Sequence, residues 1–148
     1  MSKRPALPPD MSWIIPALTV KDADAALDFY QRAFGFEKKM AMPGPDGRTV
    51  HGEMTYRGIV IMLSPEGAFG SPIKAPATTG HAPASSLYIY CEDVDALYQR
   101  ATAAGAKGVF PPQDMFWGDR MCHMTDPDGH VWSFATNVGD FDPSKVPQ

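Results

Sequence analysis

Three side chains carry the chemistry of proton transfer or metal binding. His51 and Glu53 lie two residues apart in the segment TVHGEMTY, so they share one face if that segment is a strand. A histidine beside a carboxylate can transfer protons, and both groups can ligate a divalent ion. His123, in the matching segment of the second half of the chain, would complete a set of two histidines and one carboxylate. The spacing does not show that these candidate catalytic residues meet, and a structural or pocket-lining role for each stays open.

A second group of residues suits the binding of an organic molecule. Tyr88 and Tyr90 alternate within SSLYIYC and therefore share a face of a predicted strand. The segment MFWGDR at 115–120 joins two predicted strands and combines large aromatic residues with a charged pair, which suits the lid or rim of a pocket. The alternatives are that the tyrosines fill the interior or a dimer interface, and that the segment is a dimer contact with an exposed pair of Asp119 and Arg120.

Composition excludes several classes of function. The chain of 148 residues is 44% hydrophobic and 20% charged, as in ordinary globular proteins. Its formal net charge is -4 and its basic residues are scattered, which argues against nucleic acid or membrane partners. No apolar run resembles a secretory signal or a membrane span, and Cys91 and Cys122 lie in apolar segments typical of reduced thiols. We therefore predict a cytoplasmic protein.

The elements that must position these residues follow a repeated order. The first half predicts a strand at 13–20, a helix ending at Phe34 between an Asp22 cap and Gly35, and strands at 36–42, 49–56 and 59–64. The dipeptide Arg57-Gly58 predicts a tight hairpin between the last two. The second half predicts a strand at 85–91, a helix at 93–104, a strand at 107–111, and two strands around the turn at 126–129.

The two halves also match in their letters. VKDADAALDFYQRAFG and CEDVDALYQRATAAG align at an offset of about 70 residues, which predicts a duplicated βαβββ module. We place the first module at 12–64, a linker without elements of its own at 65–83, the second module at 84–137 and a tail at 138–148. The expected fold class is α+β in a single domain.

Three segments resemble a known family. AALDFYQRAFGFE, HGEMTYRGIVIMLS and WGDRMCHMTDPDGHVWSFATN, within residues 13–137, are similar to the vicinal-oxygen-chelate superfamily, which includes glyoxalase I, extradiol dioxygenases, fosfomycin-resistance enzymes and bleomycin-binding proteins. The PhnB-like branch is the most similar. The resemblance implies two tandem modules whose curved mixed sheet forms a cup, with helices on its outer face. It also implies a homodimer, often with modules exchanged between chains.

In metal-dependent members of this family, the first and fourth strands of each module supply the ligands of a divalent ion. The resemblance assigns these positions to Ile15, Met62, Ser86 and Ser133, and none of them suits a hard divalent ion. We therefore expect no metal and no other cofactor.

The alternation of strand residues extends this assignment to the rest of the cup. We expect its lining to include Ala17, Thr19, Val60, Ser64, Tyr88, Tyr90, Val131 and Ala135. The opposite face, under the helices, should then carry Ile14, Leu18, Ile59, Ile61, Leu63, Leu87, Ile89, Trp132 and Phe134. An apolar cup with a few hydroxyl groups is typical of a ligand pocket.

The expected function is therefore the binding of a small, partly apolar organic molecule without the usual metal. The expected ligand-binding residues are Ile15, Met62, Ser86, Tyr88, Tyr90, Trp117 and Ser133. The alternative is a lyase, isomerase or dioxygenase that uses His51, Glu53 or His123, with or without a divalent metal. A third reading is an interaction module whose pocket is closed by side chains. The sequence leaves the identity of the ligand open.

Overall fold

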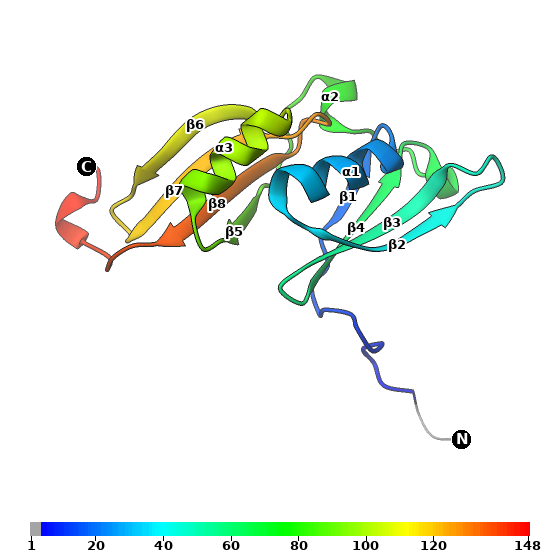
Figure 1. The fold of residues 1–148 in the computed structure, drawn as a ribbon, viewed down its shortest axis with the longest axis horizontal. Coiled ribbons are helices and arrows are strands. Elements are labelled where there is room, and N and C mark those ends of the chain that lie inside the picture. Colours follow the sequence, from blue (N-terminus) through cyan, green and yellow to red (C-terminus); the bar gives the residue numbers. More distant parts are fainter. Residues whose placement is uncertain (1–3) are drawn as a thin grey trace. The chain divides into compact units, whose positions relative to one another are not determined.

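The chain forms two compact units, which we call the first and the second module (Figure 1). The structure is a computed structural model that describes residues 4–148. The described part of the first module comprises residues 4–31 and 35–75, and the second module comprises residues 32–34 and 76–148. Each contains one four-stranded mixed sheet, which confirms the predicted α+β class. No helix within residues 4–148 is long and apolar enough to cross a bilayer.

The first module has the predicted βαβββ order. Its elements are β1 (Ala17–Val20), α1 (Ala23–Phe34), β2 (Glu37–Pro43), β3 (Thr49–Tyr56) and β4 (Ile59–Pro65), except that the last residues of α1, 32–34, belong to the second module. The strand order in the sheet is β1-β4-β3-β2, with β1 parallel to β4 and the other pairs antiparallel. A parallel pair needs a crossover connection, and the segment from α1 to β3 supplies it.

Strand β1 is shorter than the predicted strand at 13–20. It begins after Pro16, which has no N–H to donate to a neighbouring strand and also restricts the residue before it. Ile15 therefore precedes the strand. The side chains of Trp13 and Ile14 are 79% and 82% exposed, so the prediction that Ile14 packs under a helix is wrong.

Capping residues set the ends of α1 as predicted. The Asp22 side chain accepts a hydrogen bond from the backbone N–H of Ala25 at 3.1 Å, and Gly35 adopts a left-handed φ of 71° after the last turn. A Cβ atom on Gly52 would lie 3.2 Å from a methyl group of Leu27 in α1 and 3.1 Å from one of Leu63 in β4. Gly52 and Leu63 therefore face α1, and the residues beside them in each strand face the other way.

The hairpin between β3 and β4 also forms where it was predicted. Arg57 and Gly58 both adopt positive φ angles, 48° and 80°, as a type I′ turn requires. Ile59, at the start of β4, is exposed rather than buried under the helix as we expected, since it lies beside this turn.

The second module repeats the order of the first. Its elements are β5 (Leu87–Tyr90), α3 (Val94–Ala104), β6 (Lys107–Asp114), β7 (Asp119–Thr125) and β8 (Val131–Asn137), with strand order β5-β8-β7-β6. Strand β5 is shorter than predicted and leaves Ser86 outside it and exposed. Strand β6 continues past the predicted end at Pro111, with an irregular register between Phe110 and Gln113. An edge strand tolerates prolines because its outer N–H groups have no partner in the sheet.

The predicted linker contains short helices that the sequence did not indicate. They are η1 (Ala68–Gly70) and α2 (Pro76–Thr79), and a further turn, η2 (Pro143–Lys145), lies in the tail. The boundary between the modules falls inside this linker, between residues 75 and 76.

Aromatic residues form the core of the second module on the α3 side of its sheet. Trp132 and Phe134 are fully buried, and the ring of Phe34 lies 5.0 Å and 4.8 Å from theirs. The indole N–H of Trp132 donates to Oδ2 of Asp126 at 2.8 Å, so the buried donor is satisfied. The prediction that Trp132 is a core residue is confirmed.

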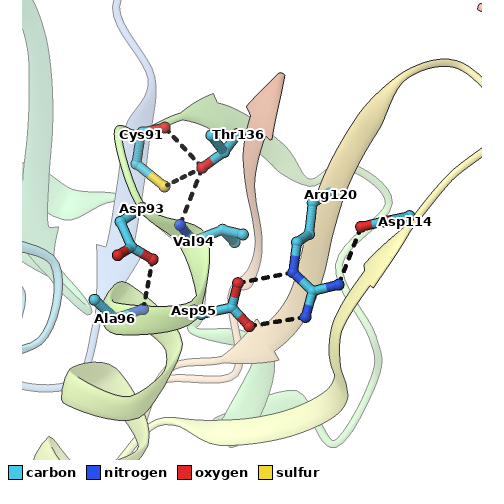
Figure 2. Close-up of polar contacts among 8 residues, drawn as sticks. All are labelled: Cys91, Asp93, Val94, Asp95, Ala96, Asp114, Arg120 and Thr136. Atoms are coloured by element: carbon cyan, nitrogen blue, oxygen red, sulfur yellow. Dashed lines mark hydrogen bonds and ion pairs between the residues drawn. The ribbon is translucent and has the colours of Figure 1, made fainter. Parts of the chain in front are cut away.

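Two polar contacts attach α3 to this sheet (Figure 2). The Thr136 hydroxyl accepts a hydrogen bond from the Val94 N–H at 3.0 Å and donates one to the Cys91 carbonyl at 2.9 Å. The guanidinium group of Arg120 bonds to both carboxylate oxygens of Asp95, at 2.7 and 2.9 Å. The first contact satisfies an N–H group at the start of the helix, which the helix itself cannot pair.

Replacement of Thr136 by valine tests the first contact. Thr136→Val keeps the shape of the side chain and leaves the Val94 N–H without its acceptor, so we expect a loss of about 1–2 kcal/mol in the free energy of unfolding. Thr102→Val is the matched control, because the Thr102 hydroxyl donates to a carbonyl of its own helix, and we expect a change within about 0.5 kcal/mol. Urea unfolding measures both, and equal effects would contradict the assignment.

Candidate functional site

The face of the second module's sheet opposite α3 carries most of the residues predicted to bind a ligand. A Cβ atom on Gly108 would collide with Tyr98 of α3, so Gly108 and its partner Met124 face the helix. Alternation then turns the intervening residues to the opposite face. Across the strands this face presents a row of Tyr88, Ser133, His123 and Phe110 and a second row of Tyr90, Ala135, Met121 and Gln113.

A buried carboxylate organises one end of this face. Asp119 is 2% exposed, and its Oδ2 accepts hydrogen bonds from the hydroxyl groups of Tyr88 at 2.7 Å and Tyr90 at 2.8 Å. Its Oδ1 accepts a third hydrogen bond from the side-chain amide of Asn137 at 3.2 Å. The indole N–H of Trp117 donates to the Tyr88 hydroxyl at 3.2 Å. We call these five residues the Asp119 cluster.

Asp119 was not among the site residues that we predicted from the sequence. We considered an exposed pair of Asp119 and Arg120, and the structure contradicts it, because adjacent strand residues point to opposite faces. Arg120 instead forms ion pairs with Asp95 and with Asp114, and its Nη1 lies 3.0 Å from Oδ1 of Asp114 (Figure 2). Asp119 and His123 lie an even number of positions apart in β7, so they lie on the same face of the sheet. This alternation could have identified Asp119 as a residue of that face from the sequence.

The aromatic rings of the cluster remain accessible although their hydroxyl groups are engaged. Tyr88 is 44% exposed and Tyr90 is 56% exposed, and their rings meet edge to face with centroids 5.7 Å apart. Gly118, at a φ of 98°, lets the 115–118 loop turn back so that Trp117 reaches Tyr88. The structure therefore brings together Tyr88, Tyr90 and Trp117, which were all predicted to bind a ligand.

The hydrogen bonds of the cluster fix its ionisation near neutral pH. Burial raises the pKa of Asp119, but the hydrogen bonds from Tyr88, Tyr90 and Asn137 outweigh it, so the pKa lies below its usual value. Burial raises the pKa of Tyr88 most, the Trp117 donor lowers it, and the bond to Asp119 raises it further, to about 12. The carboxylate is therefore ionised and the Tyr88 phenol is neutral.

A second polar pair lies on the same face. Nδ1 of His123 and the hydroxyl group of Ser133 form a hydrogen bond of 2.7 Å, and the edge of the Phe110 ring meets the imidazole at 4.6 Å between centroids. Burial lowers the pKa of His123, which favours the neutral ring at physiological pH. Ser133, predicted to bind a ligand, is 1% exposed, so its contact with His123 is its main polar interaction.

In the first module, His51 and Glu53 share the face opposite α1 and contact each other. Nε2 of His51 lies 3.3 Å from Oε1 of Glu53, and Nζ of Lys39 lies 3.0 Å from Oε2. Burial raises the pKa of Glu53, but the bonds from Lys39 and His51 prevail and lower it. Met62 is the register partner of Glu53 in β4 and lies on the same face. This ion-paired carboxylate is a weak base unless Lys39 moves away.

The four positions assigned to a metal site divide between the modules. Ile15 and Met62 belong to the first module, and Ser86 and Ser133 belong to the second. Their convergence at the bottom of a cup stays a prediction. Among residues 4–148, no three His, Cys, Asp or Glu side chains are grouped so that they could hold one metal ion.

Comparisons with known proteins relate the chain to one family. Residues 13–134 match the Glyoxalase/Bleomycin resistance protein/Dioxygenase superfamily. The uncharacterized protein Rv0887c of Mycobacterium tuberculosis is 35% identical over 133 residues, which cover 88% of this chain and 78% of that protein. The crystal structure of TioX from Micromonospora sp. ML1 is similar with a TM-score of 0.70 and 31% identity, over 86% of this chain and 99% of TioX.

A more distant similarity concerns the fold alone. The fosfomycin resistance protein FosX from Listeria monocytogenes, in complex with Mn(II) and sulfate ion, is 16% identical with a TM-score of 0.64. The similarity covers 86% of this chain and 90% of FosX.

Replacement of Asp119 by asparagine tests the central role of its carboxylate. We expect Asp119→Asn to lower the free energy of unfolding by about 2–3 kcal/mol near neutral pH, because the hydroxyl groups of Tyr88 and Tyr90 lose a charged acceptor. The folded pKa of Asp119 lies below the unfolded value of about 3.9, so this contribution is complete above the unfolded pKa. The difference between wild type and variant should shrink as the pH falls below about 4.

Urea unfolding at a series of pH values measures that difference. Asp140→Asn, a change at an exposed residue of the same module, is the control and should have little effect at any pH. A difference that widens on acidification would contradict the ionised, hydrogen-bonded state of Asp119.

Proposed function

Because the chain belongs to the Glyoxalase/Bleomycin resistance protein/Dioxygenase superfamily, we propose that it binds a small, partly apolar organic molecule without a bound metal ion. The Asp119 cluster is the observation that carries this proposal. It holds accessible aromatic rings in fixed positions on the sheet face that the family resemblance assigns to the ligand. Rigid aromatic surfaces with a few polar groups are typical of small-molecule sites.

The geometry of the cluster favours binding because its rings are oriented before a ligand arrives. The hydroxyl groups of Tyr88 and Tyr90 are both bonded to one buried oxygen, so neither side chain can change its χ1 rotamer without breaking a charge-assisted hydrogen bond. Trp117 is held to Tyr88 by a neutral hydrogen bond from its indole N–H to the Tyr88 hydroxyl group. A ligand that stacks on these rings therefore immobilises few additional side chains, which reduces the entropy lost on binding.

The polar groups near the aromatic rings supply directional contacts. Ser133 is the register partner of Tyr88, and His123 is the register partner of Ser133, so all three lie in one row across the sheet. A neutral imidazole bonded through Nδ1 to Ser133 keeps Nε2 for a further hydrogen bond. This row supports recognition of a molecule that is apolar in part and polar at its edge.

The side chains at the expected metal positions support a binding role without a cation. Met62 is a soft thioether, and Ser133 is engaged with His123. The proposal extends to a homodimer in which modules can be exchanged, to the PhnB-like branch and to a cytoplasmic location. The exposed Trp13 and Ile14 support a self-contact. Within residues 4–148 Cys91 and Cys122 form no disulfide, which is consistent with a reducing compartment.

The contact of His51 with Glu53 favours a second candidate function. The pair offers a nitrogen base beside a carboxylate, as a lyase, isomerase or dioxygenase of this superfamily would need. Lys39 opposes this role, because its bond to Glu53 stabilises the ionised carboxylate and lowers its basicity. For this reason we place the binding function first.

The binding proposal predicts saturable uptake of a neutral aromatic probe. We expect N-phenyl-1-naphthylamine to bind at a single site and to change the fluorescence of Trp117. Because the proposed binding needs no metal ion, treatment with EDTA should leave the affinity unchanged within about twofold. Tyr88→Ala should weaken binding ~10-fold, since it removes one exposed aromatic ring of the Asp119 cluster.

Trp13→Phe is the matched control for the fluorescence signal, because Trp13 lies in the first module and outside the cluster. Its affinity should equal that of the wild type. A linear, unsaturable response, or equal loss of affinity in Tyr88→Ala and Trp13→Phe, would contradict the proposed site.

Elemental analysis separates the two candidate functions. If the protein acts by binding alone, the purified chain and Glu53→Gln should both contain far less than about one divalent ion per chain. A stoichiometric ion in the wild type that is lost in Glu53→Gln would instead support the enzyme. Lys39→Gln is a useful second variant, because it frees Glu53 without removing its carboxylate.

A further inference from the structure

Asp119 places an unneutralised negative charge at the hydroxyl ends of the Tyr88 and Tyr90 rings. Within residues 4–148, its side-chain hydrogen bonds come from neutral donors, namely the phenols of Tyr88 and Tyr90 and the amide of Asn137, and the neutral indole of Trp117 also stabilises its charge. These bonds stabilise the charge but do not cancel it. A buried carboxylate without a cationic partner in its own module is uncommon, because burial penalises the charged form.

The nearest basic residue along the chain cannot neutralise this charge. Arg120 lies on the opposite face of the sheet, where Asp95 and Asp114 already pair with it. Its single positive charge is thus matched by two carboxylates on that face (Figure 2). His123, on the same face as Asp119, is kept neutral by burial. Lys107 also lies on this face, but opposite the far end of β7 from Asp119. Across the described residues 4–148, the end of the face that carries the rings therefore bears a negative charge to which no basic side chain is bonded.

The hydrogen bonds to Asp119 also change the rings themselves. A phenol that donates its proton to a carboxylate shifts electron density into its ring, because hydrogen bonds in a network polarise one another. An electron-rich ring attracts a cation placed over its face more strongly. The exposure of Tyr88 and Tyr90 leaves their ring surfaces accessible for such a contact, and the indole of Trp117 is the best cation acceptor among aromatic side chains.

From these observations we infer that the ligand of the Asp119 cluster is a flat aromatic cation, such as a protonated heteroaromatic amine. Its ring stacks against the aromatic side chains, and its positive charge is attracted by the Asp119 carboxylate and by the polarised rings. An anion of the same shape contacts the same rings but is repelled by the Asp119 carboxylate, so it binds more weakly. This inference rests on the proposed binding function and adds the charge class of the ligand.

Two aromatic probes with the same three-ring skeleton test this inference on the full chain. 9-Aminoacridine is a cation near neutral pH, and 9-anthracenecarboxylate is an anion. Calorimetric titration at low and at physiological salt gives both affinities. We expect the cation to bind at least ~10-fold more tightly, with a preference that decreases as salt rises.

Asp119→Asn tests the source of the preference. It keeps the size of the side chain and removes its charge, so the affinity for the cation should fall ~10-fold while the affinity for the anion rises or stays unchanged. Asp140→Asn is the matched control, because it removes the same charge from a nearby exposed residue. It should leave the ratio of the two affinities within about twofold.

The outcomes separate this inference from the function on which it rests. Failure of both probes to bind would overturn the binding function. Equal binding of cation and anion, or tighter binding of the anion, would overturn the charge preference and leave a binding function in place. A preference that is unchanged in a folded Asp119→Asn variant would also overturn it. If that variant does not fold, the affinities of the wild type alone decide between these outcomes.

Discussion

The alternation of side chains along strand β7 is the constraint on which the second module depends. Asp119 and Arg120 are neighbours in sequence, yet one anchors tyrosines on one face of the sheet and the other attaches helix α3 to the opposite face. A shift of one residue in register would exchange these roles and bury a guanidinium group among phenols. The pairing of β7 with β8 from Asp119 to Thr125 therefore fixes both the position of the Asp119 cluster and the packing of the helix.

The two modules use one architecture for different chemistry. In each module the first and fourth strands pair in parallel. On the sheet face opposite the helix, one residue of the fourth strand lies between its register partners in the first and third strands. That central residue is Met62 beside Glu53 in the first module and Ser133 beside His123 in the second. Equivalent positions thus carry an ion-paired carboxylate in one half and a neutral imidazole in the other. The two modules therefore combine the same strand pairing with different polar groups.

Most of the fold could be predicted from sequence because local signals define its elements. Asp22 and Asp93 cap their helices, Gly35 and Gly105 end them, and the glycine turns produce the expected hairpins. The errors were at strand ends, where a single residue changes the outcome. Pro16 delays β1, and β5 begins only after Ser86, so two of the four residues assigned to the floor of the cup lie outside the strands.

The candidate site was predictable only in part. Alternation identified Tyr88 and Tyr90 as residues that share a face, and an aromatic loop identified Trp117. The Asp119 carboxylate, which joins these residues, was not predicted. Asp119 and Arg120 are adjacent in sequence and opposite in charge, and such a pair suggests a surface ion pair more readily than two residues with different partners. Its partners come from β5 and from the end of β8, and only the paired register brings such distant segments together.

Strand β6 has a consequence for how the protein avoids aggregation. It is an edge of the second sheet, and Pro111 and Pro112 occur in succession where its register is irregular. Successive residues of a strand direct their N–H groups to opposite edges, so one of the two prolines removes a donor from the outer edge of β6. This gap hinders the pairing of an incoming strand at that point, as prolines on edge strands do in other proteins.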